Sequence, residues 1–106
     1  MRIHEYIKVD GSNPYKEWFD NLNAQAAAKI SVAKARLELG NTSNIKWFEG
    51  IGEYKINWGP GYRIYLAQDG KSLIILFGGG PKKKQQVDVE RAKELFREYK
   101  TRKKKR

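Results

Sequence analysis

The spacing of apolar residues in the second half of the chain constrains the fold more than any other feature. From Ile51 onward, two runs alternate between apolar and polar residues, and a third run, residues 72–77, is almost wholly apolar. Gly59-Pro60-Gly61 separates the first two runs, and Asp69-Gly70 separates the second from the third. A period of two is typical of β strands, and short breaks that contain glycine are typical of hairpins. The pattern therefore predicts a three-stranded antiparallel meander.

The N-terminal segment predicts one strand followed by a helix. Residues 3–9 alternate weakly, as in a strand, and Asn13 and Pro14 are typical of an N-cap and a first helical position. Four apolar residues then share one helix face: Tyr15, Trp18, Phe19 and Leu22. Aromatic residues at this spacing form a core more often than a base-stacking surface. We therefore expect this face to pack on the sheet.

A second helix is expected over residues 24–39, and a last one over residues 87–99. Inward positions of the second helix are Ile30, Ala33 and Leu37, and Gly40-Asn41 ends it. A polar loop and then residues 45–48 follow, and the aromatic pair Trp47 and Phe48 is expected to pack back onto the core. The fold class is thus α+β: a small twisted antiparallel sheet, made of the N-terminal strand and the meander, with a helical hairpin on one face and a C-terminal helix. We expect a single domain over residues 1–99 and a disordered basic tail over residues 100–106.

The net charge of the chain indicates which class of partner it binds. The chain has 22 Lys and Arg against 12 Asp and Glu, a formal net charge of +10. A charge this large in a small domain favours a phosphate-rich partner, most of all RNA. The absence of cysteine excludes thiolate catalysis and zinc–cysteine sites. No apolar run is long enough for a signal peptide or a membrane span, so a soluble, cytoplasmic protein is expected.

The apolar faces of the strands predict which residues meet. Both alternating runs must turn their apolar residues to the same side of the sheet, so the first hairpin loop needs an odd number of residues. With Gly59-Pro60-Gly61 as that loop, Lys55 faces Tyr65, Trp58 faces Tyr62, and Arg63 lies diagonal to Lys55. With Asp69-Gly70 as the second loop, Arg63 pairs with Leu76. Lys55, Arg63, Tyr65 and Lys82–Lys84 should then converge at one end of one face.

The position of Arg63 leaves two alternatives open. The central strand of a meander is apolar on any covered face, so an arginine there needs a reason. Arg63 either pairs with a carboxylate, for example Glu53, or faces a ligand. A lone lysine such as Lys55 is more often a solubility device on a strand than a functional group.

Three segments together resemble a known family. They are EYKINWGPGYRIY (residues 53–65), LFGGGPK (residues 76–82) and QQVDVERA (residues 85–92). In this combination they resemble the addiction-module killer proteins of the RelE/ParE superfamily, on its HigB-like side. The resemblance covers about the C-terminal half of the chain.

The resemblance implies a fold, an activity and partners. It implies a helical hairpin on one face of a small sheet and an RNA-binding concavity on the other. It also implies the toxin of a type II toxin–antitoxin system, which cleaves mRNA on the ribosome and is neutralised by a cognate antitoxin of helix-turn-helix type. By position, the family's sheet arginine is Arg63, its sheet lysine Lys55 and its basic residue after the strand Lys82. The chain departs from the family at Pro81, where relatives often have an acidic residue, and at Lys83 and Lys84, where small hydroxyl residues are common.

These residues suggest a metal-independent endoribonuclease without a cofactor. RNA cleavage of this kind needs a proton acceptor, charge stabilisation and a proton donor. The single histidine, His4, lies far away in the sequence. We expect Arg63 to hold the scissile phosphate, Lys55 to act as base, and Lys82 to donate a proton or bind phosphate. Tyr65, Lys83 and Lys84 are the expected RNA-binding residues.

Two other functions remain open for the same pattern. A non-enzymatic toxin of the ParE type would bind a protein target such as DNA gyrase. A non-catalytic RNA-binding protein would use the same basic face without cleavage.

Overall fold

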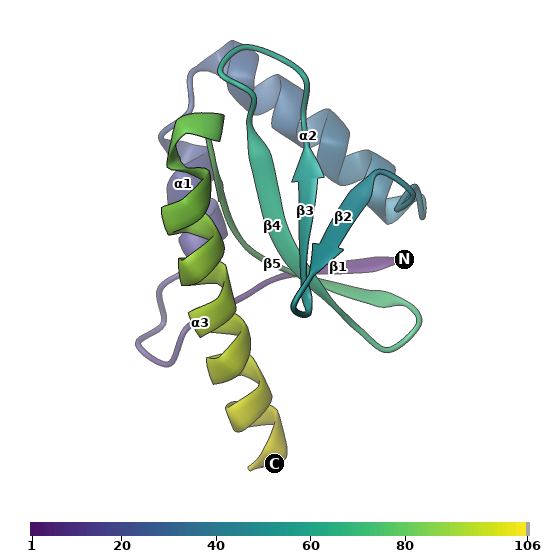
Figure 1. Ribbon diagram of the computed structural model, residues 1–106, viewed down its shortest axis with the longest axis vertical. Helices are drawn as coiled ribbons and strands as arrows, with labels where there is room; N and C mark the ends of the chain where they lie inside the picture. The colour runs from purple at the N-terminus through teal and green to yellow at the C-terminus, as the bar shows by residue number, and fades with distance from the viewer. Residues whose placement is uncertain (106) are drawn as a thin grey trace.

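Five strands form one open sheet in the computed structural model, which describes residues 1–105 (Figure 1). The strands are β1 (Arg2–Glu5), β2 (Ile45–Phe48), β3 (Ile51–Lys55), β4 (Arg63–Asp69) and β5 (Leu73–Gly80). Their order in the sheet is β1-β5-β4-β3-β2. β1 runs parallel to β5, while the other neighbours are antiparallel. The α+β class and the meander β3–β4–β5 are confirmed, but the expected wholly antiparallel sheet is wrong, because β1 pairs in parallel.

The strand β2 is an addition to the predicted sheet. It pairs with β3 so that Phe48 lies opposite Ile51, which leaves Glu49 and Gly50 as a two-residue turn. Both turn residues have positive φ, 52° and 84°, which matches the twist of a tight hairpin. Residues 45–48, for which no strand was predicted, thus form a strand, and the expectation that Trp47 packs onto the core is wrong, because Trp47 is 45% exposed.

The helices begin where their capping residues predict. In α1 (Pro14–Asp20), the Asn13 side chain accepts a hydrogen bond from the Lys16 N–H at 3.0 Å. In α2 (Ala24–Glu38), Asn23 does the same for Ala26 at 2.8 Å. These side chains satisfy amide groups that a helix N-terminus leaves without partners. The expected helical hairpin is confirmed.

Each face of the sheet carries its own core. α1 and α2 cover one face, where the buried residues include Ile30, Ala33, Leu37, Tyr54, Ile64 and Leu66. Tyr15, Trp18, Phe19 and Leu22 also pack there, as their spacing predicts. α3 (Gln85–Lys104) covers the other face, where the buried residues include Ile51, Tyr65, Ala67, Phe77, Ala92 and Leu95. A short 3-10 turn, η1 (Lys82–Lys84), leads from β5 into α3.

The C-terminal helix is longer than predicted. It starts at Gln85 and continues to Lys104, so the expected end at Tyr99 is wrong, as is the expected disorder of residues 100–104. Contacts with the rest of the domain hold this end: Arg102 donates to the Ile7 carbonyl at 2.6 Å, and Lys103 pairs with Asp69 at 2.7 Å. Arg106, the last residue of the predicted tail, lies outside the described residues. Within residues 1–105, no helix is long and apolar enough to cross a membrane.

Candidate nucleic-acid site at the end of the sheet

The strand register brings the predicted residues together in a different way from the one expected. Lys55 lies directly opposite Arg63, so the predicted Lys55–Tyr65 pair is wrong. The pairing continues with a bond from the Ile56 N–H to the Tyr62 carbonyl at 2.8 Å, so the loop is residues 57–61 instead of Gly59-Pro60-Gly61 alone. This loop still has an odd length, which keeps the faces as predicted. Lys55 and Arg63 therefore occupy the same face, and the predicted Trp58–Tyr62 strand pair is wrong.

The second hairpin moves Arg63 closer to the lysine turn than predicted. Its loop is residues 70–72, and a bulge follows Tyr65. Arg63 consequently pairs with Gly80 instead of Leu76. The Lys82 N–H also donates to the Pro60 carbonyl at 3.2 Å, which ties η1 to the β3–β4 loop. Lys55, Arg63 and Lys82 thus meet at one end of the sheet, although they come from three separate segments.

Arg63 is buried and paired with a carboxylate. It is 4% exposed, and its Nη1 donates to the Gly61 carbonyl at 2.6 Å. Its Nε lies 3.6 Å from Glu53 Oε2, and Glu53 is itself buried. Of the two alternatives for Arg63, the structure has the ion pair with Glu53. Arg63 Nε has no hydrogen-bond partner within the described residues.

Tyr65 lies beneath the start of α3. It is 1% exposed, and its hydroxyl has no hydrogen-bond partner within the described chain. Burial raises the pKa of Tyr65 above its ordinary range, and the carboxylates of Glu53 and Asp88 add to the effect. Gln85, the first residue of α3, donates from Nε2 to Glu53 at 2.7 Å and helps to close this face. Tyr65 therefore presents no ring face to solvent in this conformation.

Asp88 joins the cluster from the first turns of α3. Its Oδ2 is buried, makes no hydrogen bond within residues 1–105, and packs against Gly80, where a Cβ atom would collide with it. Burial raises the pKa of the Asp88 carboxyl, while Lys84 and Arg91 act in the opposite direction. We call Glu53, Arg63, Tyr65, Gln85 and Asp88 the buried polar cluster.

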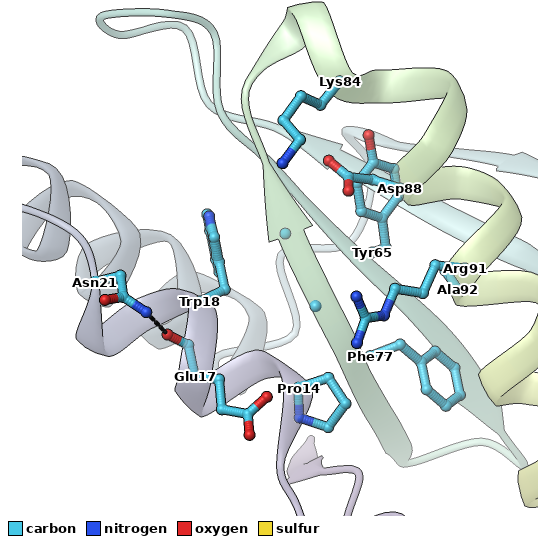
Figure 2. A pocket seen from close by; sticks show the side chains of 12 residues that line it. Pro14, Glu17, Trp18, Asn21, Tyr65, Phe77, Lys84, Asp88, Arg91 and Ala92 are labelled. Atoms are coloured by element: carbon cyan, nitrogen blue, oxygen red, sulfur yellow. Dashed lines mark hydrogen bonds between the residues drawn. The ribbon is translucent and has the colours of Figure 1, made fainter.

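A pocket of about 250 Å³ opens beside this cluster. Figure 2 shows it between α1 and α3, over Gly78 and Gly79 of β5, with Lys84 and Arg91 on the α3 side. β1 pairs with β5 only as far as Leu76, so within the described chain no strand covers the outer edge of residues 77–80. The pocket therefore lies where the sheet edge is open.

The remaining predicted residues lie on the surface. Lys55, Lys82, Lys83 and Lys84 are all exposed around the end of the sheet, and Lys84 also lines the pocket of Figure 2. Exposed lysines cost little to keep ionised and can bind phosphate without rearrangement. The predicted residues thus divide into accessible lysines and a buried pair, Arg63 and Tyr65.

Sequence reasoning missed part of this site. No site role was predicted for Gln85, Asp88 and Arg91, because their spacing is that of the polar face of an amphipathic helix. The available signal was the lack of side chains at Gly78-Gly79-Gly80, which lets another group approach the strand closely. That Asp88 is the approaching group depends on the exact start of α3.

No family model matches the chain, and comparison with curated proteins finds a relative in Haemophilus influenzae. The chain is 38% identical over 94 residues to an uncharacterized protein of Haemophilus influenzae. The matched region covers 87% of this chain and 95% of that protein, so the similarity spans the whole domain.

Proposed function

The chain belongs to the same protein family as the Haemophilus influenzae protein, and we propose that it is the toxin of a type II toxin–antitoxin pair, an endoribonuclease that cleaves mRNA without a metal. The proposal includes a RelE-like fold, a ribosome-bound mRNA substrate in the cytoplasm, and a cognate antitoxin, with helix-turn-helix character, as partner. It builds on the resemblance of residues 53–65, 76–82 and 85–92 to the HigB-like proteins. The residues at the end of the sheet provide its chemical support.

One observation carries the proposal. Within residues 1–105, four buried side-chain atoms lack a hydrogen-bond partner, and three of them, Arg63 Nε, Tyr65 Oη and Asp88 Oδ2, belong to the buried polar cluster. A buried polar group without any partner costs about 1–3 kcal/mol of stability, so a concentration of such groups calls for an explanation, although Glu53 Oε2 offsets part of the cost at Arg63 Nε from 3.6 Å. Exposed Lys55, Lys82 and Lys84 surround the cluster. The unsatisfied donors, Arg63 Nε and Tyr65 Oη, beside accessible cations are what an incomplete phosphate site would present, whereas Asp88 Oδ2 is an acceptor and suits a role in proton transfer.

The proposed reaction is an internal transfer of the phosphoryl group. The 2′-oxygen attacks the adjacent phosphorus, the bond from phosphorus to O5′ breaks, and the products are a 2′,3′-cyclic phosphate and a 5′-hydroxyl. Lys55 in its uncharged form, or Asp88 when ionised, accepts the 2′-hydroxyl proton, and Lys82 in its charged form donates a proton to O5′. Arg63 stabilises the charge on the phosphorane, and Lys83 and Lys84 hold flanking phosphates.

Arg63 and Tyr65 can reach RNA only when the start of α3 moves. At this end of α3 the N-cap, Lys84, makes no capping side-chain bond, and the preceding turn is tied to the β3–β4 loop by the bond from the Lys82 N–H to the Pro60 carbonyl. The hydrogen bond from Gln85 to Glu53 is the polar link between the first turn and the sheet. In the proposed cycle, RNA takes the place of Gln85 over the cluster, and Tyr65 then stacks on a base or orients the sugar.

The test is cleavage of a reporter mRNA in a translating extract. We expect the wild-type chain to cut the mRNA, and Lys55→Ala and Lys82→Ala to slow cutting about 100-fold, as loss of charge stabilisation does elsewhere. Both lysines are exposed, so these variants keep the fold. Lys71→Ala removes an exposed lysine at the tip of the β4–β5 hairpin and is the matched control.

Other outcomes would point to the other candidate functions. Intact mRNA together with inhibited supercoiling by DNA gyrase would replace the proposal with the ParE-type function. RNA binding without cleavage in any condition would leave a non-catalytic RNA-binding protein.

A further inference from the structure

A second pocket lies away from the buried polar cluster, between α2 and the β3–β4 loop. Its volume is about 360 Å³, and Lys29 and Arg36 line it from α2. Lys55, Asn57 and Trp58 line it from the end of β3 and the loop. We call it the Trp58 pocket. Lys55 also lies at the end of the sheet, where it pairs with Arg63.

The charge of the Trp58 pocket is of one sign. Lys29, Arg36 and Lys55 line it, and no Asp or Glu does. Within the described residues, none of these three cations makes an ion pair, whereas the neighbouring Lys34 pairs with Glu5 at 3.1 Å. Cations that converge without carboxylates repel one another, and a bound polyanion would relieve that repulsion.

The indole of Trp58 gives the pocket a flat, fixed wall. Tyr62 stacks on it with ring centroids 6.3 Å apart and planes 21° from parallel. Trp18 supports Tyr62 in turn by an edge contact at 6.2 Å. Lys29 Nζ lies over the Trp58 ring, 6.0 Å from its centroid, so a base that stacks on this face must displace the lysine, whose ammonium is then free to pair with a phosphate. An aromatic ring that is held in place and flanked by cations is the combination that binds unpaired bases.

The polar rim can contact the edge of a base. Asn44 and Asn57 line the pocket, and both are exposed. Their amide groups offer donors and acceptors, and neither makes a side-chain hydrogen bond within residues 1–105. A base stacked on Trp58 therefore meets amides that are free to bond to it.

We propose that the Trp58 pocket binds one nucleotide of a single-stranded RNA, with the base on Trp58 and the flanking phosphates on Lys29, Arg36 and Lys55. The choice of RNA as the ligand rests on the proposed function, whereas the aromatic wall and the cations of the pocket are observed independently of that function. A paired base is stacked within a helix and has no free face for Trp58, so duplex RNA is excluded from this mode.

The experiment measures binding to a probe that cannot be cleaved. A fluorescent 2′-O-methyl oligouridine has no free 2′-hydroxyl, so its anisotropy reports binding alone. We expect Trp58→Ala to weaken binding about tenfold through lost stacking. Lys29→Ala and Arg36→Ala should each weaken it about fivefold and reduce the slope of log K against log salt by about 0.7.

Matched controls separate this site from general attraction. Lys71→Ala and Arg97→Ala remove exposed cations, on the β4–β5 hairpin and on α3, and Trp47→Ala removes an exposed indole on β2. These three variants should bind like the wild type at constant salt, apart from a small loss in the charge variants. Trp58→Ala also removes support from Tyr62, so this variant could fail to fold. In that case Lys29→Ala and Arg36→Ala still test the proposal.

A second readout locates the base. A 5-iodouridine in the probe should crosslink to Trp58 on irradiation, as mapped by mass spectrometry. When a complementary strand pairs with the probe, the crosslink should disappear, and Trp58→Ala should no longer bind the probe more weakly than the wild type does. Three outcomes would each overturn the proposal. They are crosslinks at Trp47 instead of Trp58, equal losses of affinity in the α2 variants and their controls, and competition by polyglutamate that equals competition by unlabelled RNA.

Binding and cleavage can fail separately. If the wild-type chain cuts no mRNA but binds the probe through Trp58, the pocket stands and the proposed reaction falls. If the wild-type chain cuts mRNA but substitution of Trp58, Lys29 or Arg36 does not change probe binding, the reaction stands and the pocket proposal falls.

Discussion

Arg63 and Glu53 form a buried ion pair, and such a pair is costly to break. Both side chains are buried, at 5% and 6% exposure, and they lie 3.6 Å apart. A buried ion pair contributes little when intact, but loss of one partner leaves an uncompensated charge in a medium of low polarity. The desolvation cost of these two charges therefore lowers stability mainly when one of the two residues is substituted.

Glu53→Gln should lower the free energy of unfolding by about 3 kcal/mol, because Arg63 then remains charged and buried without a counterion. Urea denaturation measures the change. Lys16→Gln is the control, since it breaks an exposed pair with Asp20 and should cost less than about 1 kcal/mol. Equal effects of the two substitutions would show that the Glu53–Arg63 pair is solvated.

Asp88 gives the domain a pH dependence of unusual sign for a carboxylate. Because burial raises its pKa in the folded state, the folded chain holds a proton that the unfolded chain has released, over the window from the ordinary Asp value to the raised one. Its contribution to stability is therefore present below that window and is lost as pH rises through it.

Asp88→Asn removes this titration and should raise the melting temperature at neutral pH, with a gain that shrinks as the pH falls below the window. Thermal melts over a pH series measure it. Glu94→Gln, an exposed position on the same helix, is the control and should show no such trend. A gain from Asp88→Asn that is constant with pH would contradict the assignment.

At the scale of elements, α3 is held to the rest of the domain by different contacts at its two ends. Tyr6 donates to Glu98 at 2.7 Å, and Arg102 donates to the Ile7 carbonyl at 2.6 Å. Near the start, the hydrogen bond of Gln85 to Glu53 links the helix to the sheet. Opening of the buried polar cluster should therefore begin at the η1–α3 junction, with the far end as the fixed point.

Arg102→Ala should weaken the fixed end and lower the melting temperature by several degrees, since it removes a charged donor from a backbone carbonyl and from the Tyr6 ring. Hydrogen exchange should rise along the C-terminal turns of α3 before it rises in β4. Lys104→Ala, two residues further on, is exposed and serves as the control. Unchanged exchange in Arg102→Ala would show that apolar packing alone anchors the helix.

The elements that could be predicted from the sequence are those with strong local signals. The caps at Asn13 and the alternation from Ile51 fixed where α1 and the meander begin. The registers could not be predicted in full, because the alternation determines only whether a loop is odd or even, and the choice between residues 59–61 and 57–61 depends on how Gly59 and Gly61 turn the chain. The burial of Arg63 and Tyr65 depends on the path of α3, which no local pattern encodes.

At the scale of the whole molecule, charge acts in two ways. The net charge of +10 attracts any polyanion, and only the cations that converge on a pocket or on the end of the sheet discriminate between ligands. The chain as a whole should therefore bind RNA in a strongly salt-dependent manner.

Affinity for the 2′-O-methyl oligouridine should fall linearly on a log–log plot against salt, with about −0.7 in slope for each phosphate neutralised on a single strand. Anisotropy titrations at several salt concentrations measure the slope. A chain whose affinity is insensitive to salt would contradict a phosphate-based interaction. Uncharged detergent at matched viscosity is the control for nonspecific loss of signal.

The parallel pairing of β1 with β5 joins the two ends of the chain. Residues 2–5 pair with residues 73–76, and Tyr6 bonds to Glu98, 92 positions away. Contacts this distant form late and slow the folding of small domains. During synthesis, β1 can pair only after β5 has emerged from the ribosome, and α3 can cover its face of the sheet only after α3 has emerged as well. The first strand to be made therefore stays unpaired until at least residue 76 has been added.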